Sequence, residues 1–321
     1  MNPSWCRRSA LGFLLLIGWC LGSSQDAPQP QPSPALSNQQ KAAPAPTTPP
    51  QTAAPSQVAP EKRERIIPAG AERHFHEAVM FERDGNPENA IAEYQAALRE
   101  FPDYFAAHYN LGRLYLDRRG YSEAITELKA AVALRPDDAN AHNNLGMALK
   151  RNGDLNGALA EYRDAVRLDP KMATAQNNLA NVLYARRDFA GAVEHYRAAL
   201  QLQPNSAETH MNLGSVLDDA GKPDEAIAEY KEAIRLQPKN ASAHYNLSIV
   251  YRKKNDMTTA IAELRRAAKL SPDWPTPHIM LAHLLENSDP KAALDECVVA
   301  DGLTSDAKLH DLCQQLQKKV R

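Results

Sequence analysis

The sequence lacks most of the short motifs that carry enzyme chemistry. It has no glycine-rich loop of the kind that cradles phosphates, no Cys-x-x-Cys pair and no nucleophile elbow. Aromatic residues make up only 6% of the chain, and they are not interleaved with basic residues as in proteins that stack nucleic-acid bases. The formal net charge is -2 over 321 residues, which gives no reason to expect a polyanionic partner. We therefore expect no catalytic residues, no cofactor and no nucleic-acid partner.

The sequence also has few long hydrophobic runs, and the clearest one lies at the N-terminus. Residues 10–21 are almost entirely apolar, follow two arginines and precede the small residues Gly22 and Ser24. This pattern is typical of a secretory signal peptide, so residues 1–24 are predicted to be a signal that is cleaved after Ser24. The run is shorter than the roughly 20 residues that span a bilayer, but an uncleaved membrane anchor is an open alternative. We expect an exported protein, periplasmic or secreted, that contacts a membrane only if this segment is retained.

Residues 25–60 consist almost entirely of proline, glutamine, alanine, serine and threonine, with no aromatic residue. Such a composition cannot bury enough apolar surface to fold. The prolines favour an extended, semi-rigid chain. We predict a disordered linker over residues 25–60, which is either a spacer or an inert tail, followed by a charged lead-in over residues 61–70.

From residue 71 onward the sequence repeats every 34 residues, without an insertion through six copies. We number each copy from 1 to 34, starting at residues 71, 105, 139, 173, 207 and 241. Positions 7, 20, 24 and 27 are apolar or aromatic in nearly every copy, position 8 is small, and position 32 is proline. The closing prolines are Pro102, Pro136, Pro170, Pro204, Pro238 and Pro272.

This spacing predicts two short amphipathic helices in each copy, because positions 4, 7, 8 and 11 share one helical face and positions 20, 24 and 27 share another. The small residue at position 8 lets the two helix backbones approach closely. Glycine at position 15 in Gly85, Gly153 and Gly221 suits the turn between them. A single helix pair cannot bury both apolar stripes, so the stacked array is the expected folding unit.

The 34-residue pattern over residues 71–300 resembles the tetratricopeptide repeat family. The resemblance implies an all-α, right-handed superhelical solenoid of stacked antiparallel helix pairs, whose first helices line a concave groove that binds proteins or peptides. We expect six full repeats and a degenerate seventh within an array at 71–303. A capping helix is expected at 304–321, with one apolar face formed by Leu309, Leu312, Leu316 and Val320.

Asparagine recurs at position 6, on the helix face that the resemblance places in the groove. An amide donates and accepts hydrogen bonds at once, so a row of amides could hold the backbone of an extended peptide. The stretch Ala-His-x-Asn-Leu-Gly is similar to the repeats of O-linked N-acetylglucosamine transferase, in which such a ladder grips substrate peptide, although no catalytic region accompanies it here. The alternative is an ordinary polar helix surface. The predicted peptide-binding residues are Asn110, Asn144, Asn178, Asn212 and Asn246, with Tyr109, Asn143, Asn177, Asn181 and Tyr245 beside them.

Histidine occupies position 4 in every copy except the fourth, where Gln176 stands. Consecutive members lie one whole repeat apart, too far to share an ion bound at about 2 Å. We therefore predict no metal site and expect these histidines to pack between the two helices of each pair. The six residues are His74, His108, His142, His210, His244 and His278.

Two cysteines, Cys297 and Cys313, fall on the apolar faces of neighbouring helices at the C-terminal end. Export would place them in an oxidising compartment, where a disulfide can form. A simple antiparallel pairing, however, places Cys297 closer to Leu309 than to Cys313. Two buried free thiols are the favoured expectation, with the disulfide as the alternative.

Together these patterns predict an exported, non-catalytic scaffold that binds a protein or peptide partner in its groove. Two other functions stay open at this point. The chain could be the targeting subunit of a separate enzyme such as a glycosyltransferase. It could also be an envelope scaffold that assembles end to end.

Overall fold

The computed structural model describes residues 66–321. The predicted signal peptide, the linker and the first part of the lead-in lie outside these residues. Within residues 66–321 the chain forms fifteen α-helices and no β-strand, as the all-α prediction requires. None of these helices combines the length and the hydrophobicity needed to cross a bilayer. The helices are α1 Ala69–Arg83, α2 Pro87–Glu100, α3 Phe105–Asp117, α4 Tyr121–Leu134, α5 Ala139–Arg151, α6 Leu155–Leu168, α7 Ala173–Ala185, α8 Phe189–Leu202, α9 Ala207–Asp219, α10 Pro223–Leu236, α11 Ala241–Lys253, α12 Met257–Leu270, α13 Pro275–Leu285, α14 Pro290–Leu303 and α15 Ala307–Val320.

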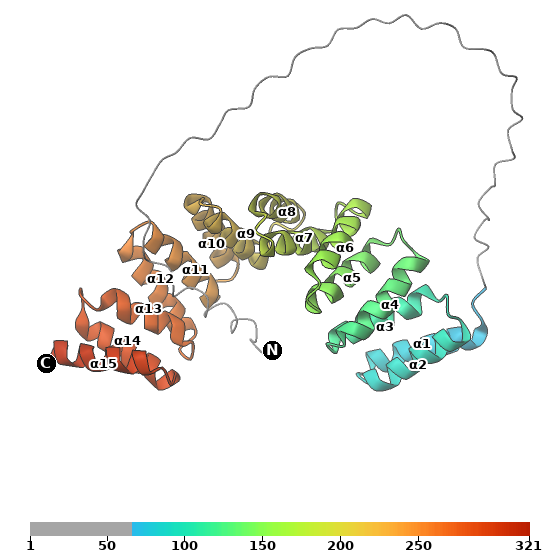
Figure 1. Cartoon of the computed structure of the whole chain (residues 1–321), viewed down its shortest axis with the longest axis horizontal. Helices are drawn as coiled ribbons and strands as arrows, with labels where there is room; N and C mark the ends of the chain where they lie inside the picture. The colour runs from blue at the N-terminus through green and yellow to red at the C-terminus, as the bar shows by residue number, and fades with distance from the viewer. Residues whose placement is uncertain (1–65) are drawn as a thin grey trace, which may run out of the picture. The chain divides into compact units, whose positions relative to one another are not determined.

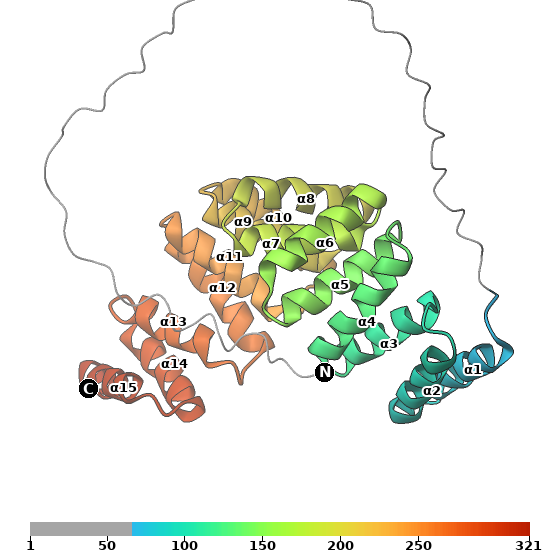
Figure 2. The same ribbon diagram turned by 45° about the vertical axis from the view of Figure 1, so that its right-hand side comes forward.

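The helices form antiparallel pairs that stack in sequence order, which confirms the predicted fold class. Each odd-numbered helix from α1 to α13 packs most extensively against the even-numbered helix that follows it. Each pair then packs against the next, and the pairs follow one another from the blue end to the red end of the array (Figures 1 and 2). The last helix, α15, packs on α14. The array therefore buries both apolar stripes of every copy, which no single pair could do.

The repeat positions predicted to form the core are buried. The leucines at position 7 and the tyrosines at position 24 are at most 3% exposed, for example Leu145 and Tyr162 in the third copy. The small residue at position 8 is needed because the helices are close. A Cβ atom added to Gly146 would lie 2.8 Å from Cε1 of the Tyr162 ring. Spacing alone thus located the core and the reason for its small residues.

The turn at position 15 has a left-handed backbone in all six full copies. Gly85, Gly153 and Gly221 adopt positive φ, as expected. In the second, fourth and sixth copies the same conformation is held by residues with a side chain, at a cost of about 1–2 kcal/mol each. These residues are Arg119, Arg187 and Asn255, with φ of 64°, 63° and 64°. The sequence showed only the glycine half of this pattern.

The first helices of the copies lie closer to one another than the second helices do. Besides its paired helix, each of α3, α5, α7 and α9 contacts the next odd-numbered helix, and the even-numbered helices show no contact of comparable extent. A stack in which one set of helices is drawn together is concave on that side. We call the side formed by the odd-numbered helices the inner surface.

The C-terminal end corrects the prediction made for the cysteines. Cys297 of α14 and Cys313 of α15 form a disulfide, with their Cα atoms 5.6 Å apart. Cys297 does lie beside Leu309, since its Sγ is 3.6 Å from the carbonyl oxygen of that residue. Leu309 and Cys313 are four residues apart and share one helix face, so an offset of one turn leaves Cys313 within reach. Val320, expected on the apolar face of this helix, is 41% exposed at its end.

Candidate peptide-binding surface

The ten predicted peptide-binding residues all lie on the inner surface. They belong to the first helices α3, α5, α7, α9 and α11, and each side chain is neither fully buried nor fully exposed. Their common orientation follows from the 34-residue period, because equivalent positions of stacked copies face the same way. The structure therefore brings the asparagines into one row along the array.

Hydrogen bonds join several of these residues across neighbouring copies. The side-chain amide of Asn144 donates to the Tyr109 hydroxyl at 3.0 Å, and that of Asn178 donates to Asn143 Oδ1 at 3.0 Å. Thr209 donates to Asn177 Oδ1 at 3.3 Å. Part of the row therefore connects one copy to the next, which the sequence did not reveal.

The amide row keeps unused hydrogen-bonding capacity at its C-terminal half. Within residues 66–321, the side chains of Asn212 and Asn246 make no hydrogen bond to another residue. An amide side chain offers two donors and a carbonyl acceptor. Asn212 and Asn246 can therefore receive a peptide backbone without first breaking a contact inside the array.

An apolar pocket that sequence reasoning missed adjoins this half of the inner surface. On α11, Tyr245 packs against Trp274 with ring centroids 4.9 Å apart, and burial raises the pKa of Tyr245 above the usual value. The pocket has a volume of about 340 Å³ and combines one cation with apolar walls. It is lined by Arg252, Thr276, Ile279, Met280, His283 and Leu284.

The histidines at position 4 lie between the two helices of each copy, as expected, and each has a partner that the sequence analysis missed. In all six cases the ring Nδ1 lies 2.5–2.6 Å from a glutamate carboxylate on the second helix. In the full copies that have this pair, the glutamate follows the histidine by 19 residues, and this constant spacing is the sequence signal that could have revealed the pairs. The pairs are His74–Glu93, His108–Glu127, His142–Glu161, His210–Glu229, His244–Glu263 and His278–Glu296.

The fourth copy replaces the histidine–glutamate pair with a glutamine on the first helix and a histidine on the second. Gln176 stands at position 4 and His195 stands where the other copies have glutamate, and Gln176 Oε1 lies 2.7 Å from His195 Nδ1. Gln176 also donates to the carbonyl oxygen of Pro170 at 3.0 Å, as several of the histidines do at the equivalent proline. The side chain at position 4 thus links the second helix to the preceding loop, whether that side chain is a histidine or a glutamine.

Comparison with known families decides what this repeat is. The profile of the tetratricopeptide repeat matches residues 62–105, 77–139, 109–173 and 211–275, and a second profile of the same repeat matches residues 171–239. The chain belongs to the tetratricopeptide repeat (TPR) family. Proteins of this family are typically scaffolds for protein–protein interaction and are generally non-catalytic. A search of curated proteins finds no match to the chain.

Solved structures share the fold at low sequence identity. A TPR protein from Parabacteroides merdae is 15% identical with a TM-score of 0.58, covering 77% of this chain and 99% of its own. YrrB, described as a TPR protein with an unusual peptide-binding site, is 21% identical with a TM-score of 0.52, covering 57% of this chain and 95% of its own. MamA is 24% identical with a TM-score of 0.50, covering 54% of this chain and 94% of its own. These similarities show the TPR fold.

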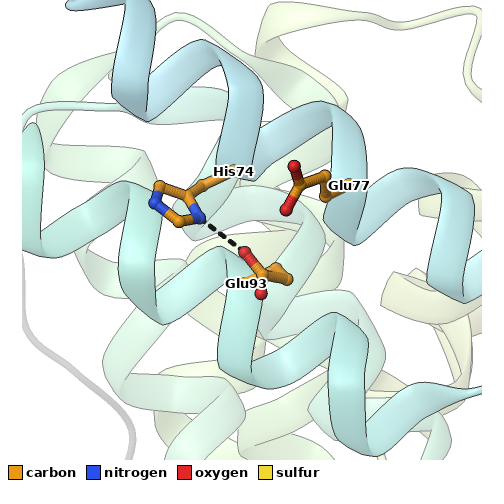
Figure 3. Close-up of side chains that lie close together, drawn as sticks. All are labelled: His74, Glu77 and Glu93. Atoms are coloured by element: carbon orange, nitrogen blue, oxygen red, sulfur yellow. Dashed lines mark hydrogen bonds and ion pairs between the residues drawn. The ribbon is translucent and has the colours of Figure 1, made fainter.

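In the first TPR, a third side chain joins the histidine pair. The ligand atoms of His74, Glu77 and Glu93 lie within 4.8 Å of one another, and Figure 3 shows Glu77 on the same helix as His74 with Glu93 on the next. The hydrogen bond common to the other TPRs accounts for the approach of His74 to Glu93. Glu77 occupies position 7, where the other TPRs bury leucine, and it is exposed because the described array begins with α1. The structure does not test for a bound metal ion here, so the absence of a metal site stays a prediction.

His108 and His195 are expected to titrate on opposite sides of the ordinary histidine pKa of about 6.5. Burial lowers the pKa of His108, but its hydrogen bonds to Glu127 and to the Pro102 carbonyl outweigh burial and raise the pKa overall. Burial lowers the pKa of His195, which faces an amide. His108 therefore stabilises the fold below about pH 6.5 and loses this effect as the pH rises through its folded-state pKa. His195 stabilises it above about pH 6.5 and loses this effect as the pH falls through its folded-state pKa.

The measurement is an NMR titration of the imidazole C2 protons, assigned with the single variants His108→Gln and His195→Gln. We expect the His108 midpoint above 6.5 and the His195 midpoint below it. Glu127→Gln is the control, and it should lower the His108 midpoint while leaving that of His195 in place. Equal midpoints for the two histidines would contradict the assignment.

Proposed function

We propose that the inner surface of the TPR array binds an extended segment of a partner protein, and that its amide row holds the backbone of that segment. The observation that carries this proposal is the row itself, which lies half-buried along five successive first helices. The similarity to YrrB, whose description names a peptide-binding site, supports the same use of this fold. The proposed role is that of a scaffold, in which binding and placement replace catalysis.

The hydrogen bonds inside the array refine which amides do the binding. Asn144 and Asn178 each donate to the neighbouring copy, whereas Asn212 and Asn246 are unengaged within residues 66–321. The pocket includes Arg252, which belongs to the same helix α11 as Asn246, and it offers an apolar side chain of the partner a place to bury. We therefore assign the principal backbone contacts to Asn212 and Asn246 and the side-chain contacts to their C-terminal neighbours.

Export is part of the proposal and rests on the sequence of residues 1–24 alone. The repeats' similarity to those of O-linked N-acetylglucosamine transferase supports the peptide-binding role of the asparagines in the same way, and it implies no catalytic role for this chain. A function as the targeting subunit of a separate enzyme would use the same surface.

The test begins with selection of binders to the full chain from a library of random 12-residue peptides with a free C-terminus. Selected peptides are then measured against Asn212→Ala/Asn246→Ala. We expect the double variant to bind about tenfold or more weakly, because two amide contacts at about 0.5–1.5 kcal/mol each are lost. The matched control is Gln201→Ala/Asn205→Ala, which removes two exposed amides on and just beyond the second helix α8. Selected peptides that bind the double variant as tightly as the parent chain would reject the proposal.

A further inference from the structure

On the inner surface, the side chain at position 12 pairs with the following TPR in three of the six full copies. The pairing is seen in the first, fourth and fifth copies, through a hydrogen bond or an ion pair of 2.6–2.7 Å. It holds neighbouring copies together along the surface. The pairs are Glu82–Arg113, Tyr184–Asp219 and Asp218–Lys253.

In the third TPR, position 12 is Lys150, and this side chain has no such pair within the described array. In the next copy, Ala185 stands at position 13, and Asn181 at position 9 accepts a hydrogen bond of 2.6 Å from Tyr196. Lys150 makes no hydrogen bond and no ion pair within residues 66–321. Lys150 is half-buried, and burial lowers the pKa of its ammonium group, with the charge of Arg151 adding to the effect. A desolvated, unpaired cation on a binding surface favours an anion.

A second donor without a partner belongs to the same copy. Tyr162 at position 24 is fully buried, and its hydroxyl has no hydrogen-bond partner. The other three tyrosines at this position all have one, namely Glu82 for Tyr94, Asn181 for Tyr196 and Ser215 for Tyr230. In the third copy the equivalent positions 9 and 12 hold Met147 and Lys150, and neither side chain is a good acceptor.

In the first TPR, the equivalent tyrosine hydroxyl has a hydrogen-bond partner. There the carboxylate of Glu82 accepts from the Tyr94 hydroxyl at 2.6 Å and from Arg113 at 2.6 Å, so one carboxylate joins a buried phenol to a cation. Lys150 occupies the position of Glu82. The third copy therefore has the phenol and a cation but no carboxylate of its own.

We propose that the third TPR binds a carboxylate supplied by the partner segment, with the Lys150 ammonium and the Tyr162 hydroxyl as its donors. The proposal rests on the proposed function, since it places one acidic contact on the surface that holds the peptide. The carboxylate belongs either to an aspartate or glutamate side chain or to the C-terminus of the segment. Arg151 adds positive potential, because its charge acts on both Lys150 and Tyr162. Glu208, whose charge raises the pKa of Lys150, is the acidic group that the incoming carboxylate must outcompete.

Access to the site requires one side chain to move. Tyr162 is fully buried, so a carboxylate reaches its hydroxyl only after a covering side chain moves. In this proposal the Lys150 chain makes that movement, because it stands at the repeat position from which Glu82 contacts Tyr94 in the first TPR. A lysine on four methylene groups makes this change without moving the helix. The carboxylate then satisfies a buried donor that the free array leaves unpaired.

The test uses the peptides selected from the random 12-residue library. Each peptide is compared with a version whose acidic residues are changed to the amides, and with a version whose C-terminus is amidated. We expect one of these changes to weaken binding to the full chain about tenfold, and which change does so identifies the source of the carboxylate. Lys150→Met, which keeps an unbranched chain, should weaken binding of the parent peptide about tenfold and abolish its dependence on that carboxylate. Tyr162→Phe should weaken the parent peptide less and keep the full helix content, because only a hydroxyl is removed.

The matched control is Lys129→Met, which changes the same charge at an exposed site on the second helix α4. It should leave the affinity and the carboxylate dependence unchanged. The proposal is overturned if neutral and acidic peptides bind equally, or if Lys150→Met keeps the full carboxylate dependence. Peptides that depend on Asn212 and Asn246 but not on Lys150 would leave the peptide-binding function standing and reject only this site. A selection that enriches no peptide would reject both.

Discussion

Replacing Glu263 with alanine is expected to lower the free energy of unfolding by about 3 kcal/mol. Glu263 is 7% exposed, and its carboxylate lies 2.6 Å from His244 Nδ1 and accepts from Arg266 at 2.5 Å. Alanine would leave the buried His244 ring without its partner on the second helix. The loss is large because an unsatisfied buried polar group bears its full desolvation cost, whereas the intact pair does not. Urea unfolding followed by far-UV circular dichroism measures the difference.

Glu263→Gln is the matched control, because it keeps an oxygen acceptor where Nδ1 of His244 needs one. The fourth TPR already uses an amide oxygen in this way, with Gln176 facing His195. We expect this variant to lose less than half as much stability as Glu263→Ala. Equal unfolding midpoints for the alanine variant and the parent chain would show that the pair contributes nothing to the fold.

Reducing the Cys297–Cys313 disulfide is expected to destabilise the C-terminal end of the array by about 3 kcal/mol. The bond closes a loop with a sequence separation of 16 residues and joins α14 to α15. Its removal raises the chain entropy of the unfolded end, and an array of stacked copies can lose its last helices without unfolding the rest. Hydrogen exchange read by mass spectrometry should show faster exchange in α14 and α15 after reduction, with α5 to α10 unchanged.

Cys297→Ala/Cys313→Ala serves as the control for this experiment. It should exchange like the reduced chain and should not respond to reductant. Alkylation of both Cys297 and Cys313 in the oxidised, folded chain would contradict the disulfide and restore the expectation of two free thiols.

The core of this protein could be predicted from particular residues of the sequence. Leu145, Gly146 and Tyr162 fall at repeat positions 7, 8 and 24, and their burial follows from the helical period and the 34-residue spacing. The row of asparagines on one surface follows from the same spacing. The positions of these residues were predictable because every copy repeats the same local pattern.

The partners of polar side chains were not predictable in the same way. The sequence placed Asn144 and Asn178 on the inner surface, but only the packed copies show that they donate to Tyr109 and Asn143 of the preceding copy. Such bonds depend on the distance between neighbouring copies, which no single repeat encodes. The unpaired hydroxyl of Tyr162 is a further example, because it arises from which residues the third copy places at positions 9 and 12.

The sequence by itself determined the all-α class, the stacking of helix pairs and the face on which each core and surface residue lies. Periodicity carries this information, since it records which residues share a face. Only the tertiary structure decided that Cys297 and Cys313 are bonded, that each histidine at position 4 has a carboxylate partner in its own copy, and that Lys150 has none. These outcomes depend on separations of a few ångströms between helices that meet in the folded array, because hydrogen bonds and disulfides form only over such short distances.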